Sequence, residues 1–97
     1  MYLLVAYDVA TSSQDGARRL RRVAKVCLDY GQRVQNSVFE CKLEPAHYVE
    51  FKQRILEIIN PELDSIRFYN LSNNWQKRVE HHGKNDDYNI EGTLLVE

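Results

Sequence analysis

The 97-residue sequence has few cysteines, glycines and prolines, and these scarcities exclude several classes of protein. Cys27 and Cys41 lie far apart and lack the paired spacing, with cysteine or histidine, of a zinc site. Four glycines form no phosphate-cradling loop, and no apolar run is long enough to cross a membrane. Two thiols at apolar positions and the lack of a secretory signal pattern predict a cytoplasmic protein with buried, reduced cysteines.

Net charge is also small, at −1, but its distribution along the chain is uneven. Residues 1–42 carry seven Lys and Arg against four Asp and Glu, whereas residues 43–97 carry six against ten. The first balance is +3 and the second is −4. Such asymmetry indicates a basic face on an otherwise acidic protein.

Apolar periodicity predicts alternating strands and helices. Helices are expected at residues 14–30, where Ser12 and Asp15 resemble a capping box, and from Glu44–Pro45 to Asn60–Pro61. Strands are expected at 2–9, at two short segments within 32–43, at 65–71, at 75–82 and at 93–96.

This order predicts an α+β fold: a ferredoxin-like βαββαβ domain with one or two extra C-terminal strands. The sheet is antiparallel and both helices lie on one face. No linker or low-complexity tract divides the sequence, so we expect a single domain over residues 1–97. The uncovered sheet face predicts a symmetric dimer.

Helical spacing assigns an apolar and a cationic face to the first helix. The apolar face is predicted to contain Ala17, Leu20, Val23, Ala24, Cys27 and Leu28. Five cations fall within eight positions: Arg18, Arg19, Arg21, Arg22 and Lys25. Few acids are spaced to pair with them, so this face is predicted to contact phosphates.

Asp8 follows the apolar run of the first predicted strand. A carboxylate at a strand end either accepts backbone N–H bonds or binds a hard cation such as magnesium. One aspartate is a sparse ligand set, but a dimer axis close to Asp8 would bring two together.

Two segments resemble a known family. Tyr7-Asp8-Val9, the cationic helix, and the string from Tyr30 to Glu40 (YGQRVQNSVFE) are similar to the CRISPR-associated protein two family of the spacer-acquisition machinery. The resemblance covers nearly the whole chain. It implies a ferredoxin-like homodimer in which Asp8 lies near the two-fold axis and binds magnesium.

The resemblance also implies roles for other residues. Asp8 takes the catalytic and metal-binding role, and Tyr7, Ser37 and Phe39 take supporting roles. The resemblance gives nucleic-acid contacts to Arg33 and to Arg18 or Arg19, a choice left open by loop-length variation in the family. The cationic face of the first predicted helix adds Arg22 and Lys25 as nucleic-acid contacts.

Two functions remain open from the sequence. The first is a magnesium-dependent endonuclease that cleaves RNA or DNA at the dimer interface. The second is a catalytically silent scaffold that binds duplex DNA within a complex with the CRISPR-associated protein one integrase. The sequence alone does not choose between them.

Overall fold

A computed structural model describes residues 1–72 and 79–84 of the chain. Its described elements are β1 (Tyr2–Asp8), α1 (Gly16–Leu28), β2 (Gly31–Gln35), β3 (Val38–Lys42), α2 (Pro45–Leu56), β4 (Ser65–Asn70) and β5 (Val79–Gly83). The strand predicted at 93–96 lies outside the described residues, as does the first part of the one predicted at 75–82.

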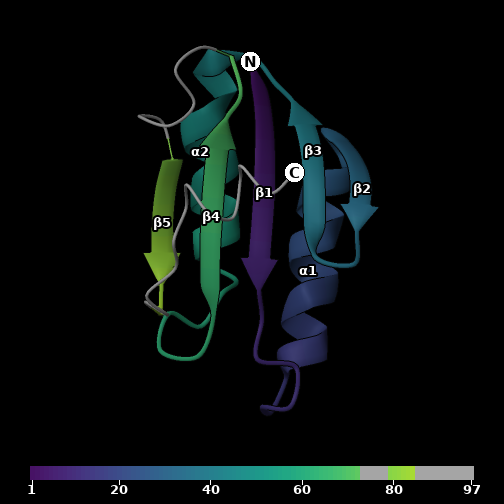
Figure 1. Cartoon of the computed structure of the whole chain (residues 1–97), viewed down its shortest axis with the longest axis vertical. Coiled ribbons are helices and arrows are strands. Elements are labelled where there is room, and N and C mark those ends of the chain that lie inside the picture. Colours follow the sequence, from purple (N-terminus) through teal and green to yellow (C-terminus); the bar gives the residue numbers. More distant parts are fainter. Residues whose placement is uncertain (73–78, 85–97) are drawn as a thin grey trace, which may run out of the picture.

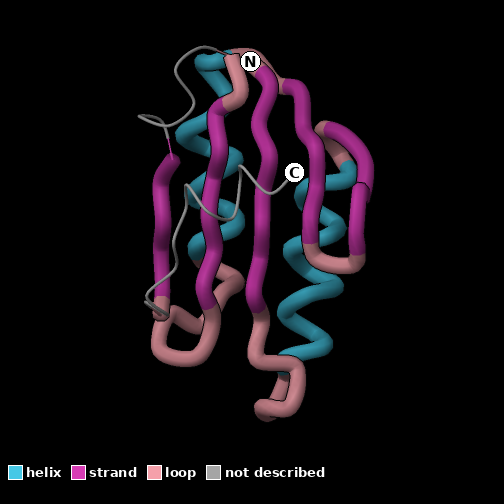
Figure 2. The backbone as a smooth tube through the Cα atoms, viewed as in Figure 1, coloured by secondary structure: helices cyan, strands magenta, loops and turns pink. Residues whose placement is uncertain are grey.

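The described strands form one sheet in the order β2-β3-β1-β4-β5, with every neighbouring pair antiparallel (Figures 1 and 2). β1 lies in the centre, as its apolar sequence predicts. Both described helices lie behind the sheet in Figure 1, so they cover a single face. The α+β, ferredoxin-like prediction is therefore confirmed, with β5 added beside β4.

Alternation along the strands separates the two faces of the sheet. Leu3, Val5 and Tyr7 of β1 are buried under the helices, and the intervening residues, including Asp8, belong to the opposite face. The helix-side core continues with fully buried side chains from the other elements: Val23, Cys27, Phe39, Phe51, Ile55, Ile66 and Phe68.

The apolar face of α1 is rotated relative to the prediction. Val23, Ala24 and Cys27 are buried as expected, but Ala17 and Leu28 are exposed. Arg19 and Val26 are buried instead. They lie four residues before and three residues after Val23, which places all three on one side of the helix.

The predicted capping box is wrong. Asp15 precedes the helix in a left-handed conformation, with φ of 65°, and its side chain makes no cap hydrogen bond. The Ser13 hydroxyl and N–H both donate to the carbonyl of Ala10, which folds the loop after β1 into a tight turn. The first helix therefore begins through turn geometry rather than a side-chain cap.

α2 begins with Pro45 at the first helical position, as predicted, but it ends at Leu56, before Asn60–Pro61. Phe51 and Ile55 are its buried residues. The following turn places Ile59 against the core and ends with Asp64, which is fully buried immediately before β4.

Gly31 illustrates how closely β2 approaches β3. A Cβ at this position would lie 1.9 Å from the carbonyl oxygen of Glu40 and 2.8 Å from Cα of Cys41. Both neighbours are backbone atoms of the paired strand, so they cannot move without disturbing the pairing. The glycine predicted as a helix stop is required here by steric contact between strands.

Gly31→Ala should lower the free energy of unfolding by about 1–3 kcal/mol, the usual cost of overpacking. Chemical denaturation monitored by circular dichroism measures the effect. Gln32→Ala, at the next exposed position of the same strand, is the matched control and should differ little from the parent protein. Equal stability of Gly31→Ala and the parent would contradict the proposed close approach.

Candidate functional site

Asp8 is exposed at the end of β1, on the sheet face opposite the helices. It pairs in register with Ser65 of β4, which fixes its backbone in the centre of the sheet. Its side chain borders an open hollow of about 220 Å³. An exposed carboxylate in this position is available to a hard cation.

The hollow beside Asp8 is polar at several points. Ser37, in the turn between β2 and β3, lines it and accepts a backbone bond from Tyr7 N–H at 2.9 Å. Ser65 also lines it, with its hydroxyl 2.7 Å from Nε2 of His81 on β5. Arg67 of β4 brings a cation to the same hollow. Ser37, which the resemblance gives a supporting role, therefore lies near Asp8.

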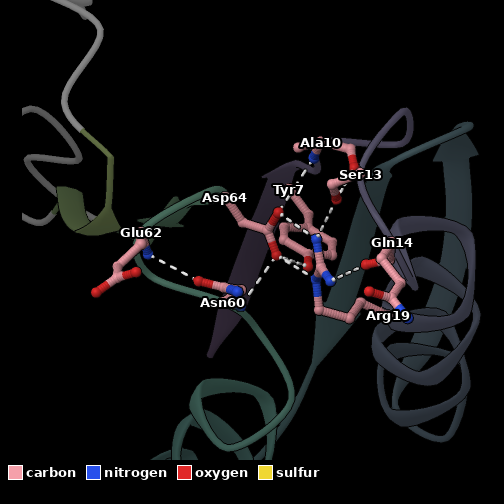
Figure 3. Close-up of polar contacts among 8 residues, drawn as sticks. All are labelled: Tyr7, Ala10, Ser13, Gln14, Arg19, Asn60, Glu62 and Asp64. Carbon is pink, nitrogen blue, oxygen red and sulfur yellow. Dashed lines mark hydrogen bonds and ion pairs between the residues drawn. The ribbon is translucent and has the colours of Figure 1, made fainter.

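The principal polar cluster of this end of the sheet surrounds Asp64 (Figure 3). Its Oδ2 accepts hydrogen bonds from the Tyr7 hydroxyl at 2.5 Å, Arg19 Nε at 2.8 Å and Asn60 N–H at 3.0 Å. Its Oδ1 accepts from Arg19 Nη2 and from Ala10 N–H, each at 3.1 Å. The carboxylate thus connects β1, the following loop, α1 and the turn before β4.

Electrostatics keep these groups in defined protonation states. Burial by itself would raise the pKa of Asp64, but hydrogen bonds from Arg19, Tyr7, Asn60 and Ala10 outweigh burial and lower its pKa from 3.8 to about 2. The hydrogen bond to Asp64 raises the pKa of Arg19. Burial, followed by the contact with Asp64, raises the pKa of Tyr7. At neutral pH the cluster contains an anion, a cation and a hydroxyl donor.

The structure separates Arg18 from Arg19. The Arg18 side chain is exposed, whereas Arg19 is buried against Asp64 and also donates to the Gln14 carbonyl and the Ser13 hydroxyl, both at 3.0 Å. Its guanidinium is therefore occupied by protein groups. The prediction that Arg19 contacts nucleic acid has no support from this position, and Arg18 is the better candidate.

The remaining cations of α1 point to solvent. Arg18, Arg21, Arg22 and Lys25 are all exposed. Arg18 and Arg22 line one side of a shallow groove whose other side is formed by residues 58–61, after α2. Four exposed cations on one helix form a positively charged surface of the kind that binds phosphates.

Arg33 and Phe39 form a contact across β2 and β3. The Arg33 guanidinium carbon lies 5.1 Å from the centre of the Phe39 ring, within the range of a cation–π interaction. Phe39 is fully buried, so its ring is unavailable to stack on a base. Phe39 therefore contacts the exposed Arg33 from within the core, and its supporting role stays a prediction.

No described region of one chain, in residues 1–72 or 79–84, brings three His, Cys, Asp or Glu side chains together as a metal site. Magnesium is commonly held by one or two carboxylates together with water and substrate phosphates. The single carboxylate of Asp8, in an open polar hollow, therefore fits a magnesium ion that keeps most of its water ligands. Among the described residues that line the hollow, Asp8 is the one that carries a carboxylate.

Asp64 and Arg67 were not identified from the sequence. The available signal for the Asp64 cluster was Arg19 itself, which shares a helical face with Val23 and Val26 and so required a buried partner. Arg67 was visible as a charge within the apolar strand Ile66-Arg67-Phe68. Neither signal specifies which distant residue completes the contact.

The fold and the position of Asp8 agree with the ferredoxin-like class expected from the sequence. The chain belongs to the family CRISPR associated protein Cas2, whose family model matches residues 1–79. This is the family that the motifs around Asp8 and from Tyr30 to Glu40 resemble.

Individual relatives support the same assignment. "CRISPR-associated endoribonuclease Cas2" of Chlorobaculum tepidum is 53% identical over 96 residues, which is 99% of this chain and 100% of the relative. "CRISPR-associated endonuclease Cas2" of Halalkalibacterium halodurans is 46% identical over 95 residues, covering 98% and 99% of the two chains.

A solved structure is similarly related. The crystal structure of Streptococcus pyogenes Cas2 at pH 6.5 is 60% identical over the aligned part, with a TM-score of 0.71. The match covers 82% of this chain and 96% of that chain.

Within the described residues, no helix of the present chain is long and apolar enough to span a membrane.

Stability should fall in acid because of Asp64. Its lowered pKa contributes about 2 kcal/mol of folding free energy above about pH 5, and this contribution is lost as the pH falls toward 2. Asp64→Asn should be less stable at pH 6 and should show a shallower loss of stability between about pH 6 and pH 3. Urea unfolding at a series of pH values measures this.

Asp29→Asn is the matched control, because Asp29 is exposed and its nearest cation contact, to Arg54, is 3.9 Å long. That variant should keep the parental pH dependence. An Asp64→Asn variant with the same pH slope as the parent would contradict the assigned pKa.

Proposed function

We propose that this chain is a homodimeric, magnesium-dependent endonuclease of CRISPR spacer acquisition that cleaves RNA or DNA, with Asp8 as its catalytic metal ligand. The observation that carries the proposal is the exposed Asp8 carboxylate, fixed in the central strand beside a polar hollow. The printed names of the curated relatives, endoribonuclease and endonuclease, support the reaction class. Free, buried cysteines support a reducing, cytoplasmic location.

Dimer formation supplies what one chain lacks. The sheet face that carries Asp8 also carries Tyr2, whose side chain is 51% exposed, while both described helices cover the other face. Pairing these faces in two copies would bury apolar surface and bring the two Asp8 carboxylates toward a common axis. Two carboxylates would then serve one metal site.

Magnesium bound at this site would activate water and neutralise charge that develops on the phosphoryl group. The chain's own contribution is positional. Asp8 holds the ion, and the β1–β4 pairing fixes the backbone of Asp8.

A second candidate function is supported by these cations. Arg18, Arg22 and Lys25 are exposed on α1, and no complete metal site exists among the described residues of one chain. In this proposal the dimer is a catalytically silent scaffold that grips duplex DNA by its phosphates. Its partner would be the CRISPR-associated protein one integrase.

Asp8→Asn should abolish cleavage of RNA and DNA. The fall in cleavage rate should exceed the roughly 100-fold that follows removal of a group that only supports a metal ligand. Dimer mass and nucleic-acid affinity should be retained, since the substitution is isosteric and exposed. Cleavage assays with and without a chelator, together with light scattering, measure these properties. Asp29→Asn is the control. Undiminished cleavage by Asp8→Asn would contradict the proposal, and a clean monomer of the parent at micromolar concentration would contradict the shared site.

Arg18→Ala combined with Arg22→Ala should weaken nucleic-acid binding, because fewer phosphates are neutralised by the protein. The dependence of log affinity on log salt should become shallower by about one for each phosphate that the variant no longer neutralises. Arg54→Ala removes an exposed cation of α2 and is the control. Fluorescence anisotropy at several salt concentrations measures both. An unchanged salt slope in the double variant would exclude this face as the phosphate-binding surface.

A further inference from the structure

Two residues that flank Asp8 are held by one side chain. Tyr7, immediately before it, donates its hydroxyl to Oδ2 of Asp64, and Ala10, two residues after it, donates its backbone N–H to Oδ1 (Figure 3). Asp8 itself pairs with Ser65, the residue next to Asp64. The side chain of Tyr7 and the backbone of Ala10, on either side of the exposed aspartate, are therefore tied to one buried carboxylate.

Arg19 contacts the Asp64 carboxylate from α1, and we call Asp64 and its partners Tyr7, Ala10 and Arg19 the clamp. Arg19 donates two hydrogen bonds to the Asp64 carboxylate through Nε and Nη2, and the same guanidinium reaches the Gln14 carbonyl and Ser13 hydroxyl. The Ser13 hydroxyl in turn donates to the carbonyl of Ala10. The loop that leaves Asp8 is thus fixed by the same charge pair that fixes Tyr7.

Asp64 is itself anchored. Its carboxylate accepts the N–H of Asn60, its N–H donates to the Asn60 carbonyl at 2.7 Å, and its carbonyl accepts the N–H of Lys84 at 2.8 Å. The side chain is fully buried, as is most of Arg19. A buried ion pair of this kind contributes little net stability relative to well-packed apolar residues, but it fixes geometry through directional contacts.

We propose that Asp64 is the positioning residue of Asp8: its carboxylate, neutralised by Arg19, holds Tyr7 and Ala10 and so sets the direction in which the Asp8 carboxylate faces a metal ion. This inference rests on the proposed metal role of Asp8. It assigns Arg19 to positioning rather than to phosphate contact. It also gives Tyr7 a definite supporting role, as hydroxyl donor to Asp64.

The test compares variants of the clamp with a variant of another ion pair. Tyr7→Phe removes one hydroxyl, and Asp64→Asn replaces an acceptor oxygen with a donor. Lys52→Met is the matched control, because Lys52 pairs with Glu80 at 2.9 Å between α2 and β5 and does not contact the clamp. The dimer is studied throughout. Manganese binding by calorimetry, steady-state cleavage, thermal unfolding and amide exchange of Ala10 are measured.

Tyr7→Phe should weaken manganese binding roughly 10-fold and Asp64→Asn roughly 100-fold, the range found when a group that orients a metal ligand is removed. The kcat for cleavage should fall in the same order with KM unchanged, and the Ala10 amide should exchange faster in Asp64→Asn. Lys52→Met should lower the midpoint of thermal unfolding without changing manganese affinity.

Arg19→Lys adds a test of mechanism. The lysine keeps the charge but cannot make the two-point contact with the carboxylate. We expect it to lower kcat and manganese affinity while leaving the salt slope of nucleic-acid binding at the parental value. A shallower slope would assign Arg19 to phosphate contact and overturn its positioning role.

The outcomes separate this inference from the proposed function. If Asp8→Asn loses metal binding and cleavage while folded Tyr7→Phe keeps both at parental values, the positioning role is overturned and the metal role stands. If Asp8→Asn keeps both, the metal role fails and the positioning role with it. Tyr7→Phe removes a single hydroxyl, so it keeps the test decisive should Asp64→Asn fail to fold.

Discussion

The charge pair between Arg19 and Asp64 is the contact on which this end of the molecule depends. Arg19 belongs to α1 and Asp64 to the turn before β4, and both side chains are removed from water. An unpaired charge in either position would be costly, so the folded positions of the helix, the turn and the end of β1 depend on one another. The pairing of Asp8 with Ser65 lies directly beside this contact. The loop after β1, which has no side-chain helix cap, is also fixed by it.

The same contact explains why α1 can carry so many cations. Its inward arginine is neutralised by Asp64, while Arg18, Arg21, Arg22 and Lys25 remain in water at low desolvation cost. Arginines of this one helix therefore lie both in the interior and on the surface. The exposed cations lie on α1, and Asp64 is held by Arg19 of the same helix. The cationic surface and the buried aspartate are therefore joined through α1.

Much of the fold could be predicted from the sequence because it depends on local patterns. The apolar run of β1, Pro45 at the start of α2 and the turn between β2 and β3 each carry their signal within a few residues. The buried face of α1 could not be predicted fully, since an arginine at an apolar position indicates a buried partner without identifying it. Asp64 lies 45 residues from Arg19 in the sequence, and no local pattern pairs them. For the candidate site, Asp8 and the exposed cations were named from the sequence, whereas the contacts of Asp64 and the place of Arg67 beside the hollow required the structure.

The two aspartates beside the end of β1 have environments that point to different functions. A carboxylate offers about four lone-pair positions to hydrogen-bond donors. Asp64 already accepts from Tyr7, Ala10, Asn60 and twice from Arg19, so it has no position left for a metal ion. Asp8, one residue after Tyr7, is exposed and borders an open hollow. Of these two aspartates, Asp8 is therefore the one whose oxygens are open to a cation. The difference between the two aspartates thus comes from their hydrogen-bond partners, which occupy the oxygens of Asp64 and leave those of Asp8 facing the hollow.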